Sequence, residues 1–88
     1  MQIGGFVYIL TNFDNNVLYI GVTYELFFRT IEHREKLYPK YFTAKYNLFK
    51  LVYFKQFSTI EEAIAEEKRL KNWKSQWKIN LINNFNPN

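Results

Sequence analysis

The chain contains no cysteine and a single histidine, and its 88 residues include only three glycines and two prolines. Without cysteine, neither a disulfide bond nor a thiolate metal site can hold the fold, which fits a reducing compartment. No apolar run approaches the about 18 residues of a membrane-spanning helix, and no basic segment followed by an apolar stretch marks a secretion signal. We therefore expect a cytoplasmic protein with no membrane association.

The chain is instead rich in aromatic side chains, which make up 20% of its residues within a hydrophobic fraction of 48%. Large rings bury much area each, so a chain this short can form a core. No repeat, low-complexity tract or linker divides it, and we expect one domain over residues 1–88. The net charge of +4 favours a polyanionic partner, although a basic soluble protein without such a partner fits the charge equally well.

Local patterns predict a strand, a strand, a helix, a strand and two helices, in that order. The predicted segments are 6–10, 17–22, 25–37, 48–57, 59–73 and 76–83. An Asn-rich turn joins the first two as a hairpin, and Pro39 follows the end of the first helix. Ser58 and Glu61 have the spacing of a capping box for the second helix. The expected fold is α+β, with a three-stranded antiparallel sheet flanked by helices in the order β-β-α-β-α-α.

Glu67 has an unusual position on the second predicted helix. At about 100° per residue, it lies within about 5° of the mean direction of Ile60, Ala63, Ile64 and Leu70. The other acids of this helix, Glu61, Glu62 and Glu66, point away as solvated charges. Because a buried carboxylate must be neutralised or paired, two interpretations stay open. Glu67 forms an ion pair or reaches water at an edge, or it binds a divalent metal ion, since Mg²⁺ takes few carboxylates and completes its shell with water.

Arg29 and His33 are four residues apart on the first predicted helix, so they project from neighbouring points on one side. An arginine fork matches a phosphate, and a histidine exchanges protons near neutral pH. The alternative is a surface pair in which Arg29 bridges to Glu25 and His33 has no role.

Tyr8 and Tyr19 lie on the two arms of the predicted hairpin. Cross-strand aromatic pairs are mostly structural. A tyrosine hydroxyl can also donate, accept or release a proton when cations lower its pKa.

Together these residues resemble the GIY-YIG nuclease superfamily, above all its small stand-alone bacterial members, which are similar to the N-terminal domain of the excision-repair incision subunit. The resemblance rests on the order and spacing of Tyr8, the run 18–23, Leu26, Arg29, His33, Glu67 with Lys68, and Asn86 with Pro87. It extends over nearly the whole chain. The first motif reads Phe6-Val7-Tyr8 rather than Gly-Ile-Tyr, whereas the second, Tyr19-Ile20-Gly21, is intact.

The resemblance implies an endonuclease that hydrolyses DNA phosphodiesters through one Mg²⁺ or Mn²⁺ ion held by Glu67. Tyr8 or Tyr19, helped by His33, would orient or deprotonate the attacking water, and Arg29 would stabilise the transition state. The resemblance does not say which tyrosine is the base. Substrate binding would involve Gly21, whose missing side chain lets a phosphate approach, together with Lys45 and Asn86.

The implied setting is DNA repair or processing, with low sequence specificity and action on branched, nicked or single-stranded DNA. A partner protein can direct such a domain to its substrate, and the oligomeric state stays open. Two alternatives remain: a nucleic-acid-binding module with weak or lost catalysis, and a structural or protein-interaction domain that uses its aromatic surface. Cleavage assays with Mg²⁺, Mn²⁺ and EDTA separate them.

Overall fold

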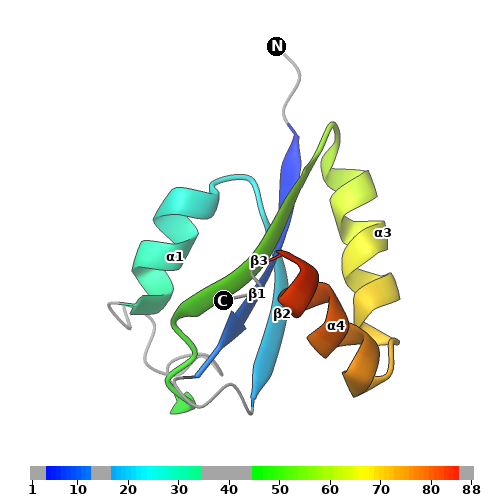
Figure 1. The fold of residues 1–88 in the computed structure, drawn as a ribbon. Helices are drawn as coiled ribbons and strands as arrows, with labels where there is room; N and C mark the ends of the chain where they lie inside the picture. The colour runs from blue at the N-terminus through cyan, green and yellow to red at the C-terminus, as the bar shows by residue number, and fades with distance from the viewer. Residues whose placement is uncertain (1–3, 13–16, 35–44, 86–88) are drawn as a thin grey trace.

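The computed structural model describes residues 4–12, 17–34 and 45–85, which form one antiparallel sheet with a helix on each side (Figure 1). The elements are β1 (Gly5–Thr11), β2 (Leu18–Thr23), α1 (Leu26–Arg34), β3 (Lys50–Phe57), α3 (Ile60–Lys71) and α4 (Ser75–Phe85). The α+β fold and its element order are as predicted. Across these residues, no helix combines the length and apolar character needed to cross a lipid bilayer.

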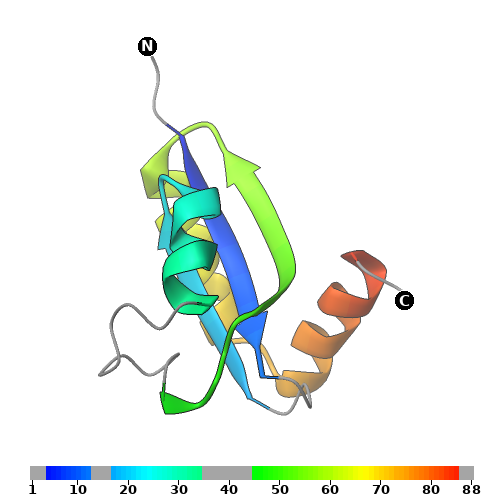
Figure 2. The ribbon, with the colours of Figure 1, turned by 90° about the vertical axis from the view of Figure 1, so that its left-hand side faces the viewer.

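β1 is the central strand of the sheet, in the order β2-β1-β3. The predicted hairpin is present, and its register sets Tyr8 opposite Gly21 and Leu10 opposite Tyr19. The pairing of β1 with β3 shifts between Ile9 and Leu10, as at a β-bulge. Because β1 lies between the other two strands, β2 forms one edge of the sheet. It lies close to both α1 and α3 (Figures 1 and 2).

Each face of the sheet has its own core because side chains alternate along β1 and β2. The face towards α3 buries Val7, Ile9, Ile20, Val52, Tyr53, Ala63 and Leu70. The opposite face, which α1 covers, buries Tyr8, Leu10 and Leu48, with Tyr19 and Leu26 packed against them. The Tyr8 ring is thus a core side chain of the α1 face, where only 2% of the residue is exposed.

The N-terminus of α3 corrects the predicted capping box by one residue. Thr59, not Ser58, caps the helix: its Oγ1 accepts the Glu62 N–H at 3.2 Å, and its own N–H donates to Glu62 Oε1 at 3.2 Å. The local sequence permits both registers. The one adopted makes Ile60 the first helical residue, where its side chain lies directly over Gly5.

The buried side of α3 also differs from the prediction. Ala63 and Leu70 are fully buried, whereas Ile64 is 38% exposed. The stripe centred on Ala63 and Leu70 leaves Glu66 and Glu67 about 50° away on its two flanks. Glu66, expected to be solvated, has a side chain only 13% exposed, against 21% for Glu67. The predicted centre was wrong because Ile64 was counted as inward-facing, whereas the small Ala63 makes the close approach to the sheet.

Candidate active site

The space beside Gly21 is filled by the Tyr8 ring. A Cβ at Gly21 would lie 2.6 Å from both Cζ and Oη of Tyr8, and 2.9 Å from Cε2 of Tyr19. Because Tyr8 and Gly21 face each other across the strand pair, the missing side chain lets the ring lean over β2 towards the sheet edge. The structure thus gives Gly21 a packing role, and its predicted contact with a phosphate stays a prediction.

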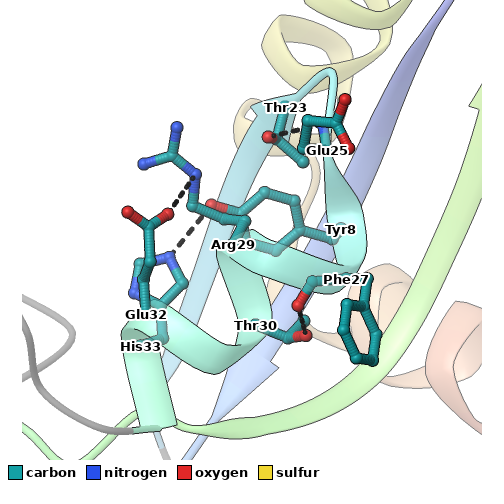
Figure 3. Close-up of polar contacts among 8 residues, drawn as sticks. All are labelled: Tyr8, Thr23, Glu25, Phe27, Arg29, Thr30, Glu32 and His33. Carbon is teal, nitrogen blue, oxygen red and sulfur yellow. Dashed lines mark hydrogen bonds and ion pairs between the residues drawn. The ribbon is translucent and has the colours of Figure 1, made fainter.

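His33 meets Tyr8 and Tyr19 above this gap. The Tyr8 hydroxyl is 3.2 Å from His33 Nε2, in a buried hydrogen bond that Figure 3 shows from the α1 side. The three rings surround one point: their centroids are 6.1 Å apart for the two tyrosines, 5.9 Å for Tyr8 and His33, and 5.8 Å for Tyr19 and His33. Residues from β1, β2 and α1 therefore converge at this point.

The surroundings shift the pKa of both hydrogen-bonded groups. Burial raises the pKa of the Tyr8 hydroxyl; Tyr19 raises it further, Arg29 lowers it and Glu67 adds a small rise. Burial is the main cause that lowers the pKa of His33. The positive charge of Arg29 lowers this pKa further, and the negative charge of Glu32 raises it. Near neutral pH, Tyr8 therefore keeps its proton and His33 is the neutral base beside it.

Arg29 lies on the α1 side of the same cluster, and its charge acts on both Tyr8 and His33. Its Nε is 3.6 Å from Glu32 Oε1, and the side chain is 37% exposed (Figure 3). The alternative surface pair was expected with Glu25, but the partner is Glu32, three residues on. Because a half-exposed pair at this distance contributes little, the guanidinium can turn its planar fork to a phosphate oxygen.

Glu67 approaches the site from α3, and its charge is among those that act on Tyr8. Its Oε2 is 3.3 Å from Lys71 Nζ, one turn further along the helix. This is the ion pair that one of the two sequence interpretations anticipated. The Lys71 side chain is 55% exposed, so the pair is a weak one that a stronger cation can replace.

Glu66 differs from Glu67 in how firmly it is held. Arg69 donates to it from Nε at 2.7 Å and from Nη2 at 2.5 Å. Such a bidentate pair is much stronger than a single contact with lysine. Of the two flanking acids, Glu66 is therefore committed to structure, and Glu67 is the one available for a ligand.

The donor set fits a hard divalent cation with few protein ligands. Within residues 4–12, 17–34 and 45–85, no three His, Asp or Glu side chains gather as a metal cluster. A single carboxylate with water suits Mg²⁺, which keeps several waters in its shell. Glu67 is the side chain that would hold it.

The other predicted residues lie apart or cannot be placed. Lys45 is exposed, with its Nζ 5.5 Å from the centre of the Tyr46 ring. Asn86 lies outside the described residues. Sequence reasoning missed Glu32 and Lys71 as partners of the site, although their i+3 and i+4 spacings to Arg29 and Glu67 were visible signals.

The described residues form a small α+β domain in which Tyr8, Tyr19 and His33 meet beside β2, and the charges of Arg29 and Glu67 act on Tyr8. The family model described as the GIY-YIG catalytic domain matches residues 4–80, and the chain belongs to this family of the nuclease superfamily. The resemblance drawn from the motifs is thereby confirmed.

A solved structure supports the fold. The UPF0213 protein BH0048 from Bacillus halodurans, determined by solution NMR, is 28% identical to this chain. The match has a TM-score of 0.56 and covers 90% of this chain and 82% of the other. A search of the curated proteins finds no match.

Proposed function

We propose that this protein is a divalent-metal-dependent DNA endonuclease that hydrolyses phosphodiester bonds at the Tyr8–His33 site. The supporting observation is the buried hydrogen bond between Tyr8 and His33, set where the charges of Arg29 and Glu67 both act. It joins a hydroxyl that can orient water to a neutral base, beside a guanidinium that is only weakly paired with Glu32. General-base hydrolysis of a phosphodiester needs these three groups.

The shifted pKa values support one assignment of the roles that the sequence left open between Tyr8, Tyr19 and His33. In the proposed mechanism the attacking water donates a hydrogen bond to the Tyr8 hydroxyl, which itself donates to His33 Nε2. As the water oxygen bonds to phosphorus and the bond from phosphorus to the 3′ oxygen breaks, one water proton passes to Tyr8 and the Tyr8 proton passes to His33. The released 3′ oxygen takes up a proton from solvent. Tyr8 is then a relay and His33 the final base, consistent with a raised pKa on the first and a lowered one on the second.

Two further groups would manage the negative charge of the transition state. Arg29 exchanges Glu32 for a nonbridging oxygen, which its fork binds with two parallel hydrogen bonds. A divalent ion at Glu67 would supply Lewis-acid stabilisation of the leaving 3′ oxygen. Tyr19 packs against both other rings and keeps them in position.

Glu67→Gln tests the proposal, with Glu61→Gln, an exposed acid of the same helix, as the matched control. We expect Glu67→Gln to lower Mg²⁺- or Mn²⁺-dependent cleavage of plasmid and branched DNA by roughly two orders of magnitude or more, because Lewis-acid stabilisation accounts for several kcal/mol. Mn²⁺ binding, followed by electron paramagnetic resonance, should fall with it, while Glu61→Gln leaves both unchanged. Full-rate cleavage by Glu67→Gln would overturn the metal role.

The Glu67–Lys71 ion pair also favours a second candidate, a nucleic-acid-binding module with little catalysis, because lysine already neutralises the acid. The same assay separates the two functions. Binding of DNA in EDTA without cleavage in Mg²⁺ or Mn²⁺ would favour the second.

A further inference from the structure

α4 exposes large apolar side chains. None of its residues is fully buried. Trp77 is 51% exposed and Phe85 45%, and Phe54 of the neighbouring β3 is 40% exposed. Exposed rings grouped on one side of a small protein commonly mark a binding surface. We call Phe54, Trp77 and Phe85 the α4 aromatic surface.

The rings of this surface are held in place by two groups of contacts. Phe85 packs on Tyr53 and Phe54 with centroids 5.2 and 5.3 Å apart, and Trp77 packs on Trp73 at 5.8 Å; all are edge-to-face. The guanidinium of Arg69 lies 4.6 Å from the Trp73 ring centre, and its charge also acts on Tyr53 of the other group. The exposed rings are therefore fixed in position and not loose side chains.

The chain segment that carries these rings is rich in positive charge. From residue 68 to the end, the chain has no acidic residue and five cationic ones: Lys68, Arg69, Lys71, Lys74 and Lys78. Arg69 pairs with Glu66 and Lys71 with Glu67, so Lys68, Lys74 and Lys78 are the cations of this segment with no acidic partner among the described residues. A ligand that is complementary to this surface needs flat apolar groups that pack on the rings and negative charges that pair with the lysines.

Unpaired nucleotides have this combination, whereas duplex DNA does not. In a duplex the base faces stack on one another and only phosphates and base edges meet a protein. In a single strand each base offers its face to an aromatic side chain, and cations follow the backbone.

We propose that the α4 aromatic surface binds unpaired nucleotides, stacking bases on Trp77 and Phe85 while Lys74 and Lys78 meet the phosphates. This inference rests on the proposed nuclease function, and it makes DNA with a single-stranded segment the preferred substrate over a plain duplex. α4 and α1 lie on opposite sides of β3 (Figures 1 and 2), so the strand-binding surface is separate from the candidate active site. Binding there can be lost while the chemistry remains.

Tryptophan fluorescence of the full chain, in EDTA to prevent cleavage, measures this directly. We expect single-stranded oligothymidylate of about 12 nucleotides to quench the emission and to bind more tightly than a duplex of equal length. Trp77→Ser should weaken single-strand affinity about tenfold to hundredfold, followed by anisotropy of a labelled oligonucleotide, and Trp77→Phe should restore most of it. Lys74→Gln should lower the slope of log affinity against log salt by about 0.7.

Phe27→Ser is the matched control, because Phe27 is a 70% exposed ring on α1. It should leave single-strand affinity unchanged. Equal binding of single strand and duplex without quenching, or an equal loss in Phe27→Ser, would overturn the inference. So would a wild-type dimer, seen by light scattering, that Trp77→Ser dissociates, because the surface would then bind a second copy of the chain.

Cleavage separates this inference from the proposed function. If both hold, Trp77→Ser cleaves a blunt duplex at the wild-type rate in Mn²⁺ but loses the preference for substrates with a single-stranded arm. If no DNA is cleaved while quenching by single strands persists, the nuclease proposal fails and the inference about the surface stands.

Discussion

Gly21 shows how one residue can position a neighbouring side chain by having no side chain of its own. Gly21 lies opposite Tyr8 in the pair of β1 and β2, and its missing side chain leaves room for the Tyr8 ring. A larger residue at this position would occupy the space that the ring fills. The Tyr8 ring is also fixed from above by His33 and from the side by Tyr19. Because it is only 2% exposed, it cannot swing away into solvent. The orientation of the Tyr8 hydroxyl therefore depends on the glycine at position 21.

Gly21→Ala should consequently destabilise the fold and displace the Tyr8 hydroxyl from His33. The added methyl group would lie 2.6 Å from Cζ and Oη of Tyr8. Overpacking of this kind costs about 1–3 kcal/mol, measurable by urea unfolding. In a Tyr8→Ala background the same change should cost clearly less, because the obstructing ring is gone. If the two substitutions are additive, the contact is not the cause.

At the scale of elements, the sequence predicted whether each segment is a helix or a strand. It was a poorer guide to which side of each helix packs against the sheet. The β-branched and aromatic runs and the Asn-rich turn predicted the hairpin, and the strand pairing sets Tyr8 and Tyr19 on neighbouring strands with their rings 6.1 Å apart. The side of α3 that faces the sheet was predicted wrongly, because a helical-wheel projection gives the apolar residues Ile64 and Ala63 equal weight. Close packing favours the smaller one, and only the docked helix shows this.

The capping register of α3 was ambiguous for a similar reason. Ser58 and Thr59 are both good caps, and each is followed three residues later by a glutamate. Local chemistry cannot choose between them, since each would satisfy the same free N–H groups. The choice depends on where Ile60 packs against Gly5, a contact between distant parts of the chain.

Two single substitutions in this cap measure which register the helix uses. Thr59→Ala should lower the free energy of unfolding by about 1 kcal/mol, because it removes the hydroxyl that accepts the Glu62 N–H. Ser58→Ala, at an exposed neighbouring position, should change it by less than about 0.5 kcal/mol. Urea unfolding followed by circular dichroism compares the two. An equal or larger loss for Ser58→Ala would contradict the observed register.

At the scale of the whole molecule, the Tyr8–His33 pair should shape stability against pH on both sides of neutrality. The pKa of His33 lies below its ordinary 6.5 in the folded state, so the unfolded chain binds that proton first as the pH falls. Its effect is a loss of stability as the pH drops below about 6.5. The pKa of Tyr8 lies above its ordinary 10.0, so the unfolded chain releases that proton first as the pH rises. The contribution of the buried Tyr8 hydroxyl to stability is therefore complete below about pH 10 and is lost as the pH rises above it.

The two ends of this profile should therefore respond to different substitutions. His33→Gln should flatten the free energy of unfolding between about pH 5 and pH 7 and leave the alkaline side unchanged. Tyr8→Phe should reduce the decline of the free energy of unfolding above about pH 10. Urea unfolding across this range gives the difference curves. If the wild type and His33→Gln run parallel on the acid side, then burial beside Arg29 does not hold His33 neutral. The assignment of His33 as the base that receives the Tyr8 proton would then lose its physical ground.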